Sequence, residues 1–307
     1  MNPTLPVAAF QFIFHCDTSP RLPAFAGSAW RGAFGHALKS TVCVVRDVNC
    51  ADCLLYRSCA YPYIFETPPP PDTGKLRNYT AAPHPFALVI GPDSPQTPYT
   101  LGINLFGRGL HYLPYIVHAM DKAGAHGLGK HRQTVFKLAE VRQQDGNGEW
   151  IPVFAPGLAL SPLNALVPVT PPLPEALRIN WLTPLRLRRE DRTVTAQNFQ
   201  FADLFSALLR RVSLLSYFHT DTPLETDFAG LTRAAKQVNL QTPDLHWWDW
   251  TRYSTRQQAS MEMGGLLGSF GLDGADIEAF WPYLWLGQWT LVGKAATMGL
   301  GQYRIHL

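Results

Sequence analysis

The first half of the chain contains runs of hydrophobic and polar residues with the two-residue period of β-strands, separated by patterns with the period of helices. The strand-like runs are residues 6–14, 86–91, 99–106 and 133–142. The helical patterns are residues 28–42 and 110–123, each with apolar side chains on one face. The resulting order, strand, helix, strand, strand, helix, strand, predicts a ferredoxin-like split βαβ arrangement.

The second half of the chain has the same order of patterns, without obvious repetition of the sequence. Strands are predicted at 178–188, 245–253, 261–272 and 302–306, and helices at 201–217 and 273–286. Prolines are dense between Pro152 and Pro174, where they exclude a continuous helix or a central strand. We therefore expect an α+β fold of two tandem ferredoxin-like (RRM-like) domains, 1–155 and 178–307, joined by a proline-rich linker at 156–177.

The composition is that of a globular protein, because 46% of the residues are hydrophobic and 16% are charged. No apolar run reaches the ~18 residues of a membrane span, and the first residues lack a basic region followed by a cleavable apolar stretch. We therefore expect a cytoplasmic protein without a membrane partner. The net charge of +3 neither supports nor excludes a nucleic-acid partner, so any phosphate-binding surface must be a local patch.

Four of the five cysteines lie close together, in a C-x6-C-x2-C-x5-C pattern. In a cytosolic protein this clustering favours a metal over disulfides, and four thiolates suit tetrahedral zinc. Thiolates alone do not separate zinc from an iron–sulfur cluster, and four cysteines without a metal are the remaining alternative. We expect structural zinc and no catalytic metal, because sulfur fills every coordination position. The predicted ligands, in an insertion at 43–59 of the first domain, are Cys43, Cys50, Cys53 and Cys59.

A glycine-rich segment, LVGKAATMGLGQYRI, precedes the last predicted strand. Gly293, Gly299 and Gly301 permit a positive φ and let backbone amides approach a phosphate or a helix end. A phosphate-binding P-loop is excluded, because Lys294 follows the first glycine and does not precede a Ser or Thr after the last one. A tight loop between a helix and a strand is the alternative interpretation.

The chain resembles the CRISPR repeat-processing endoribonucleases of the RAMP superfamily, whose glycine-rich loop is a hallmark. The resemblance is most specific in MEMGGLLGSFGLDG (261–274), FWPYLWLGQW (280–289) and VGKAATMGLGQYRI (292–305). It extends to residues 182–190, 201–219 and 250–257, and to LPAFAGSAWRGAFGHALKSTVC (22–43) near the start. The resemblance implies tandem ferredoxin-like domains that bind CRISPR repeat RNA. It also implies metal-independent cleavage, in which a ribose 2′-hydroxyl attacks the neighbouring phosphate.

Such a reaction needs a base near the hydroxyl, an acid near the leaving 5′-oxygen and cations that stabilise the phosphorane. His36 is the first candidate, because relatives keep a general acid or base at the matching place in the early helix. Arg31 and Lys39 of the same helix are candidates to flank the phosphate. Tyr253, Ser254 and Arg256 form a second catalytic candidate cluster. A structural histidine and solvated strand ends are the respective alternatives.

Basic and aromatic residues supply candidate RNA contacts. Lys294 of the glycine-rich segment is a candidate phosphate clamp, together with the loop glycines. The densest basic cluster, which either follows an RNA backbone or is simply solvated, consists of Arg186, Arg188, Arg189, Arg192, Arg210 and Arg211. The rings of His246, Trp247, Trp248 and Trp250 either stack on unpaired bases or enter the core.

Two other functions remain open from the sequence. A non-catalytic RNA-binding RAMP subunit of a CRISPR effector complex would share the fold and the glycine-rich loop but lack the acid or base. A zinc-binding structural adaptor is a more distant alternative. The expected partners are CRISPR repeat RNA and other subunits of a CRISPR effector complex.

Overall fold

A computed structural model describes residues 2–16, 20, 22–23, 25–75, 81–91, 98–128, 134–254 and 259–307. The chain divides into two compact units. The N-terminal unit consists of Leu5–Val167 and Leu214–Asp221, and the C-terminal unit of Met1–Thr4, Pro168–Ser213 and Thr222–Leu307. In the described ranges no helix is long and apolar enough to cross a membrane.

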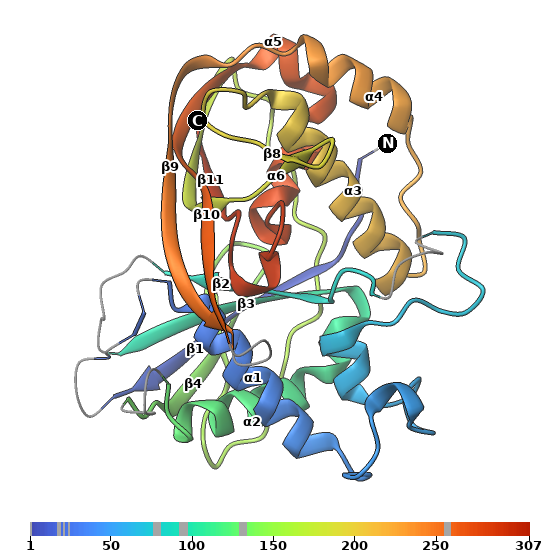
Figure 1. Cartoon of the computed structure of the whole chain (residues 1–307), viewed down its shortest axis with the longest axis vertical. Helices are drawn as coiled ribbons and strands as arrows, with labels where there is room; N and C mark the ends of the chain where they lie inside the picture. Colours follow the sequence, from blue (N-terminus) through green and yellow to red (C-terminus); the bar gives the residue numbers. More distant parts are fainter. Residues whose placement is uncertain are drawn as a thin grey trace. The chain divides into compact units, whose positions relative to one another are not determined.

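The N-terminal unit is a five-stranded antiparallel sheet with two helices side by side on it (Figure 1). The strands are β1 (Val7–His15), β2 (Phe86–Ile90), β3 (Tyr99–Phe106), β4 (Lys137–Gln144) and β5 (Trp150–Phe154). They lie in the order β2-β3-β1-β4-β5, and α1 (Gly27–Val42) and α2 (Leu113–Ala125) follow β1 and β3 in the chain. Short helical turns cover Cys50–Asp52, Pro62–Glu66 and Gly107–Tyr112. The order of elements is the predicted split βαβ arrangement, with β5 added at one edge.

Aromatic packing fixes α1 on this sheet. Trp30 is fully buried, and its ring centroid lies 5.0 Å from that of Phe14 of β1. Its indole nitrogen donates to the Tyr99 hydroxyl at 3.0 Å, so the polar atom of the ring is satisfied inside the core. Phe34 and Leu38, one and two turns further along α1, are also buried. One face of α1 is therefore anchored and the opposite face is left to solvent.

A buried histidine in the N-terminal unit is part of the core. His219 is 1% exposed, and its Nε2 lies 2.7 Å from the Pro83 carbonyl oxygen, which can only accept. The Tyr63 hydroxyl lies 3.1 Å from Nδ1 and is placed to donate to it. Burial raises the pKa of Tyr63 to about 12, which keeps this donor protonated at neutral pH. Since both ring nitrogens are satisfied by the protein, this histidine is structural.

The C-terminal unit is a four-stranded antiparallel sheet in the order β11-β6-β10-β9. Its strands are β6 (Ala176–Leu185), β9 (Gln241–Ser254), β10 (Ala259–Asp273) and β11 (Tyr303–His306). A separate two-stranded ribbon joins β7 (Arg188–Arg189) to β8 (Arg192–Thr193). The helices are α3 (Phe201–His219), which ends in the N-terminal unit, α4 (Phe228–Ala234), α5 (Gly274–Ile277) and α6 (Trp281–Thr290). The mixed α+β class with antiparallel sheets is thus confirmed in both units.

Phenylalanine rings hold α3 against the segment before α6. The Phe205 centroid lies 4.5 Å from that of Phe280 and 5.7 Å from that of Tyr283. Gly287 of α6 is packed so closely that an added Cβ would lie 2.0 Å from the Tyr303 hydroxyl. This packing brings β11, and the glycine-rich segment before it, to a fixed place on the sheet.

Candidate functional site

His36 lies on the exposed face of α1, one residue beyond the buried Gly35. Gly35 is in close contact with Phe65, whose ring atom would lie 2.4 Å from an added Cβ. Consecutive helical residues are about 100° apart around the axis, so His36 points away from that contact. The imidazole is therefore held by a well-packed helix and remains accessible to a ligand.

Arg31 and Lys39 lie on the side of α1 that faces the aromatic rings of Tyr61 and Phe65. The Arg31 guanidinium carbon is 4.4 Å from the Phe65 centroid, and the Lys39 ammonium is 5.6 Å from the Tyr61 centroid. The two rings stack on each other, with centroids 5.7 Å apart. Their cation–π contacts thus lie to one side of His36 and do not frame it.

A second histidine, His84, lies next to Arg31 and is not among the residues predicted from the sequence. Its Nδ1 is 2.6 Å from the Thr67 hydroxyl oxygen, and its Nε2 is 3.4 Å from an Arg31 nitrogen. Because the Thr67 hydroxyl donates to the Tyr63 carbonyl at 3.1 Å, His84 Nδ1 is the donor to Thr67, and Nε2 accepts from Arg31. No sequence pattern links Arg31 and His84, so only the fold reveals this pair.

The glycine-rich loop is attached to the end of β6 by backbone hydrogen bonds. Lys294 N donates to the Arg186 carbonyl at 2.9 Å, and Gly301 N donates to the Pro184 carbonyl at 3.0 Å. Gly293, Gly299 and Gly301 have φ angles of 83°, 90° and 70°. The amides of Gly299 and Gly301 are thus used inside the protein. The glycines shape the loop, and a phosphate would meet side chains here and not these amides.

Replacing Gly301 with alanine is expected to lower the free energy of unfolding by more than the roughly 1–2 kcal/mol of a left-handed backbone. An added Cβ would lie 1.8 Å from the Val292 carbonyl oxygen, so the loop must move. Gly157→Ala is the matched control, since Gly157 has φ 85° and no atom within 4 Å of an added Cβ. Urea denaturation of both variants checks this. Equal losses would show that the contact with Val292 does not restrict the loop.

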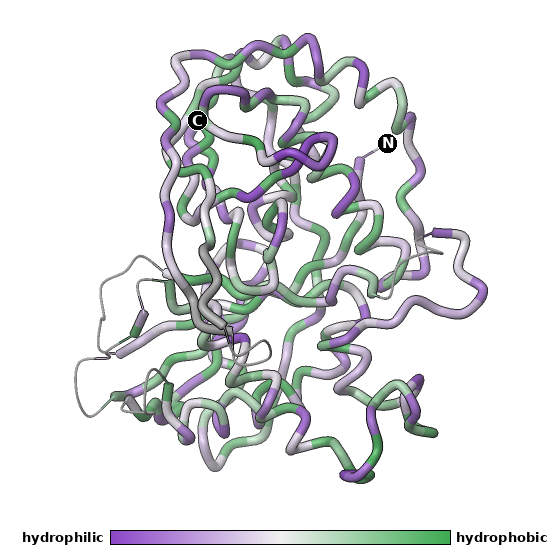
Figure 2. The backbone as a smooth tube through the Cα atoms, viewed as in Figure 1, coloured by the Kyte–Doolittle hydropathy of each residue, from purple (hydrophilic) through white to green (hydrophobic). Residues whose placement is uncertain are grey.

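Three cations gather beside this loop. The pKa of Lys294 is lowered by partial burial and by the positive charges of Arg188 and Arg186, although its side chain remains exposed. Arg188 is half-exposed and forms a weak surface pair with Asp191 at 3.7 Å, on the hydrophilic ribbon of β7 and β8 (Figure 2). Because the two arginine charges help to lower the pKa of Lys294, the three cations are held close together without full neutralisation. Such a group attracts a phosphate, which relieves the repulsion.

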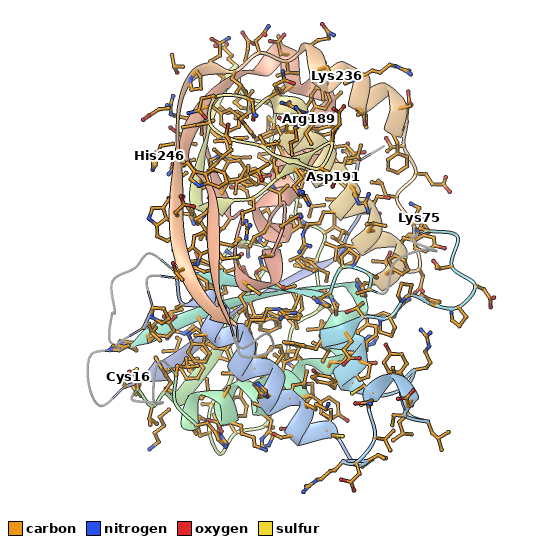
Figure 3. The ribbon with its side chains drawn as sticks, in the orientation of Figure 1. Cys16, Lys75, Arg189, Asp191, Lys236 and His246 are labelled. Atoms are coloured by element: carbon orange, nitrogen blue, oxygen red, sulfur yellow. The ribbon has the colours of Figure 1, made fainter. Side chains whose placement is uncertain are left out.

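The other predicted basic residues do not all join this group. Arg189 pairs with Asp203 at 3.1 Å, and Figure 3 shows it above Asp191. Arg211 donates to the Thr290 carbonyl at 2.6 Å, and burial lowers its pKa to about 10. Arg192 and Arg210 are exposed. Arg189 and Arg211 therefore have internal contacts, whereas Arg192 and Arg210 lie on the surface.

Two tryptophans stack on β9, which is the edge strand of its sheet. The rings of Trp248 and Trp250 are half-buried, with centroids 4.9 Å apart and planes at 21°. Trp247 is 36% exposed and donates to the Asp249 carboxylate at 2.8 Å. His246, labelled on this strand in Figure 3, is exposed. These rings offer flat surfaces of the kind on which bases stack.

The side chains of the second catalytic candidate cluster are outside what the structure describes. The backbone of Tyr253 pairs with Ser260 in the hairpin, but its side chain is outside the description. Arg256 lies wholly outside the described residues. A catalytic role for either residue therefore stays a prediction.

The four clustered cysteines line one small cavity, of about 30 Å³, in the N-terminal unit. All four are half-buried and described, and none of them is in a disulfide. Among the described residues, however, no group of three or more His, Cys, Asp or Glu side chains is arranged so that it could hold a metal ion. The predicted zinc therefore stays a prediction at this point.

Two family models match the chain, one in each half. Residues 179–303 match the model described as CRISPR-associated endoribonuclease Cas6. Residues 5–164 match AF_1859_N, described as an N-terminal domain. An uncharacterized protein of Archaeoglobus fulgidus is 27% identical over 173 residues, which are 54% of this chain and 57% of that protein. The match thus spans little more than half of that relative's length.

Solved structures share the fold over the whole chain. Cas6 (TTHB231) of Thermus thermophilus, in a product complex, is 17% identical with a TM-score of 0.57, covering 98% of this chain and 99% of that one. Cas6 (TTHA0078), also in a product complex, is 18% identical with a TM-score of 0.53, covering 99% and 100%. A chain of a partial Cas6-RT-Cas1–Cas2 complex is 16% identical with a TM-score of 0.53, covering 99% of this chain and 46% of that one.

Proposed function

We propose that the chain is a member of the Cas6 family of CRISPR-associated endoribonucleases, which binds a CRISPR repeat RNA and cuts it at one defined phosphodiester. The observation that carries the proposal is the family match over 179–303, which contains the cation group of Arg186, Arg188 and Lys294. The partner is the repeat RNA of a CRISPR precursor transcript, and other CRISPR proteins are further partners.

The proposed reaction is an intramolecular transfer within the RNA and uses no metal ion. The ribose 2′-hydroxyl loses its proton and attacks the adjacent phosphorus, while the bond to the 5′-oxygen of the next nucleotide breaks and that oxygen gains a proton. The products carry a 2′,3′-cyclic phosphate and a 5′-hydroxyl. One group must accept the first proton and one must donate the second.

His36 provides one of these two proton transfers in the proposed mechanism. An imidazole exchanges protons near neutral pH, and the ring stands exposed on a helix that core packing holds in place. Arg31 is engaged with Phe65 and His84, so its proposed contribution is to the charge of this side of α1. Tyr253 and Arg256 are further candidates for the second transfer.

The cation group of the C-terminal unit binds the RNA backbone in this proposal. Lys294 and Arg188 are exposed, and their charges favour phosphate through counterion release. Arg192 and Arg210 extend the exposed positive charge. Trp248 and Trp250 would accept unpaired bases on their rings, because stacking is indifferent to base identity.

The proposed function is tested by incubating the full chain with the repeat RNA of its own CRISPR array in EDTA. One defined cut is expected, with a 5′-hydroxyl product, and a shuffled RNA of equal length should remain intact. Binding of the repeat without any cut would instead indicate a non-catalytic RNA-binding subunit. Cutting that is absent in EDTA and restored by Mg²⁺ would contradict the metal-independent mechanism.

A further inference from the structure

We propose that the segment 43–59 binds one zinc ion through Cys43, Cys50, Cys53 and Cys59, and that Lys39 of α1 supports this site as a neighbouring cation. The site would be structural and separate from RNA cleavage. The proposal goes beyond the function given above and does not depend on it.

The segment 43–59 has no buried hydrophobic core. None of its residues, all of which the structure describes, is buried. Val44 is 78% exposed and Leu54 fully exposed, so apolar burial contributes little to the order of the segment. Ordering a backbone costs about 1–2 kcal/mol per residue. A segment without apolar burial needs another source of free energy to stay ordered, and a metal ion supplies it in small cysteine-rich elements.

The cysteines share one cavity. The residues that are half-buried in this segment are the four cysteines and Tyr56, and all five line that cavity. Cys53 N donates to the Cys50 carbonyl at 3.2 Å, closing a tight turn between two of the ligands. The aliphatic residues Val44, Val45, Val48 and Leu55 also border this cavity, but four cysteines around one small cavity are the ligand set of a structural zinc site.

The cavity must contract when the ion enters. The sulfurs do not form a metal-holding group among the described residues, and zinc requires them at about 2.3 Å. Because none of residues 43–59 is buried, side-chain rotation and small backbone shifts can bring the sulfurs together without disrupting a core. The C-terminal end of α1, where Cys43 N donates to the Lys39 carbonyl at 2.9 Å, would remain in place.

Lys39 lies beside the cysteines. It lines the same cavity, and its positive charge acts to lower the pKa of the Cys50 thiol, against the larger effect of burial. A zinc ion with four thiolates carries two net negative charges, so an adjacent ammonium offsets part of that charge. In this proposal Lys39 supports the metal site, and the catalytic role expected from the sequence stays a prediction.

The expected result is about one equivalent of zinc in the purified full chain, with no visible absorbance. Cys53→Ala should lose the metal, and Cys16→Ala, which removes the cysteine outside the cluster, should retain it. If Cys53→Ala does not fold, thiol titration of the wild-type protein decides. Four thiols should react slowly with the reagent, and zinc should be released at the same rate as these thiols react. Iron in place of zinc, or no metal with fast reaction of all five thiols, would overturn the proposal.

Lys39→Met tests the role of this lysine at the metal site, because a lysine that acts only in catalysis would not affect the release of zinc. Zinc should leave this variant several-fold faster under competition with a chelator dye, because the charge next to Cys50 is lost. Lys122→Met, a lysine in the last turn of α2, is the matched control and should release zinc like the wild type. Unchanged zinc release in Lys39→Met would remove this lysine from the proposed site.

Discussion

His36→Ala is expected to slow single-turnover cleavage of the repeat RNA by about 100- to 10,000-fold, with little change in affinity. The exposed imidazole is the proposed proton-transfer group, and its loss leaves the RNA-binding cations untouched. Replacing it should also flatten the limb of the pH–rate profile that the histidine produces. Rapid-quench cleavage and filter binding on the same preparation separate the two effects.

Lys294→Ala is the matched variant for this experiment. It removes a positive charge from the group with Arg186 and Arg188, so it should weaken binding and reduce its salt dependence. The shape of the pH–rate profile should stay unchanged. A wild-type rate and profile in His36→Ala would show that the histidine is structural, and Tyr253, Arg31 and Arg256 would be the next residues to replace.

A single 2′-deoxynucleotide on the 5′ side of the cut is expected to abolish cleavage. The substitution removes the attacking oxygen and leaves the phosphates that the cations contact, so binding should be nearly unchanged. A deoxynucleotide one position away is the control and should be cut normally. Product analysis of the control RNA should show a 2′,3′-cyclic phosphate at the new 3′ end. Normal cutting of the substituted RNA would mean that water or another nucleophile attacks.

Most elements could be predicted from the sequence because their hydrophobic periods are strong. Their ends were less accurate. The helix predicted from residue 110 begins as α2 at Leu113, after a tighter turn over Gly107–Tyr112, because Pro114 fits only the first turn of a helix. The helix predicted at 273–286 is divided into α5, a short turn and α6, with Pro282 again in the first turn. Proline positions, which the hydrophobic period ignores, decide both boundaries.

The candidate site was harder to predict than the fold. Helical spacing correctly places Arg31 and Lys39 on α1, but spacing cannot show that Tyr61 and Phe65 draw both cations to one side. The same limit hid His84, whose contact with Arg31 spans 53 positions of the chain. Glycine spacing indicates a special loop, yet only the hydrogen bonds to β6 show that the loop amides are already occupied. Long-range partners decide what such residues can do.

The position of β9 at the edge of its sheet also bears on self-association. Among the described strands β9 pairs only with β10, so its outer backbone groups form an open template onto which another chain could add. Pro243 removes one donor from this edge, and Asp244 and Asp249 give it negative charges. These carboxylates would repel a second copy of the strand. The edge is thereby protected against aggregation, and the half-buried rings of Trp248 and Trp250 on the same strand are not covered by another copy.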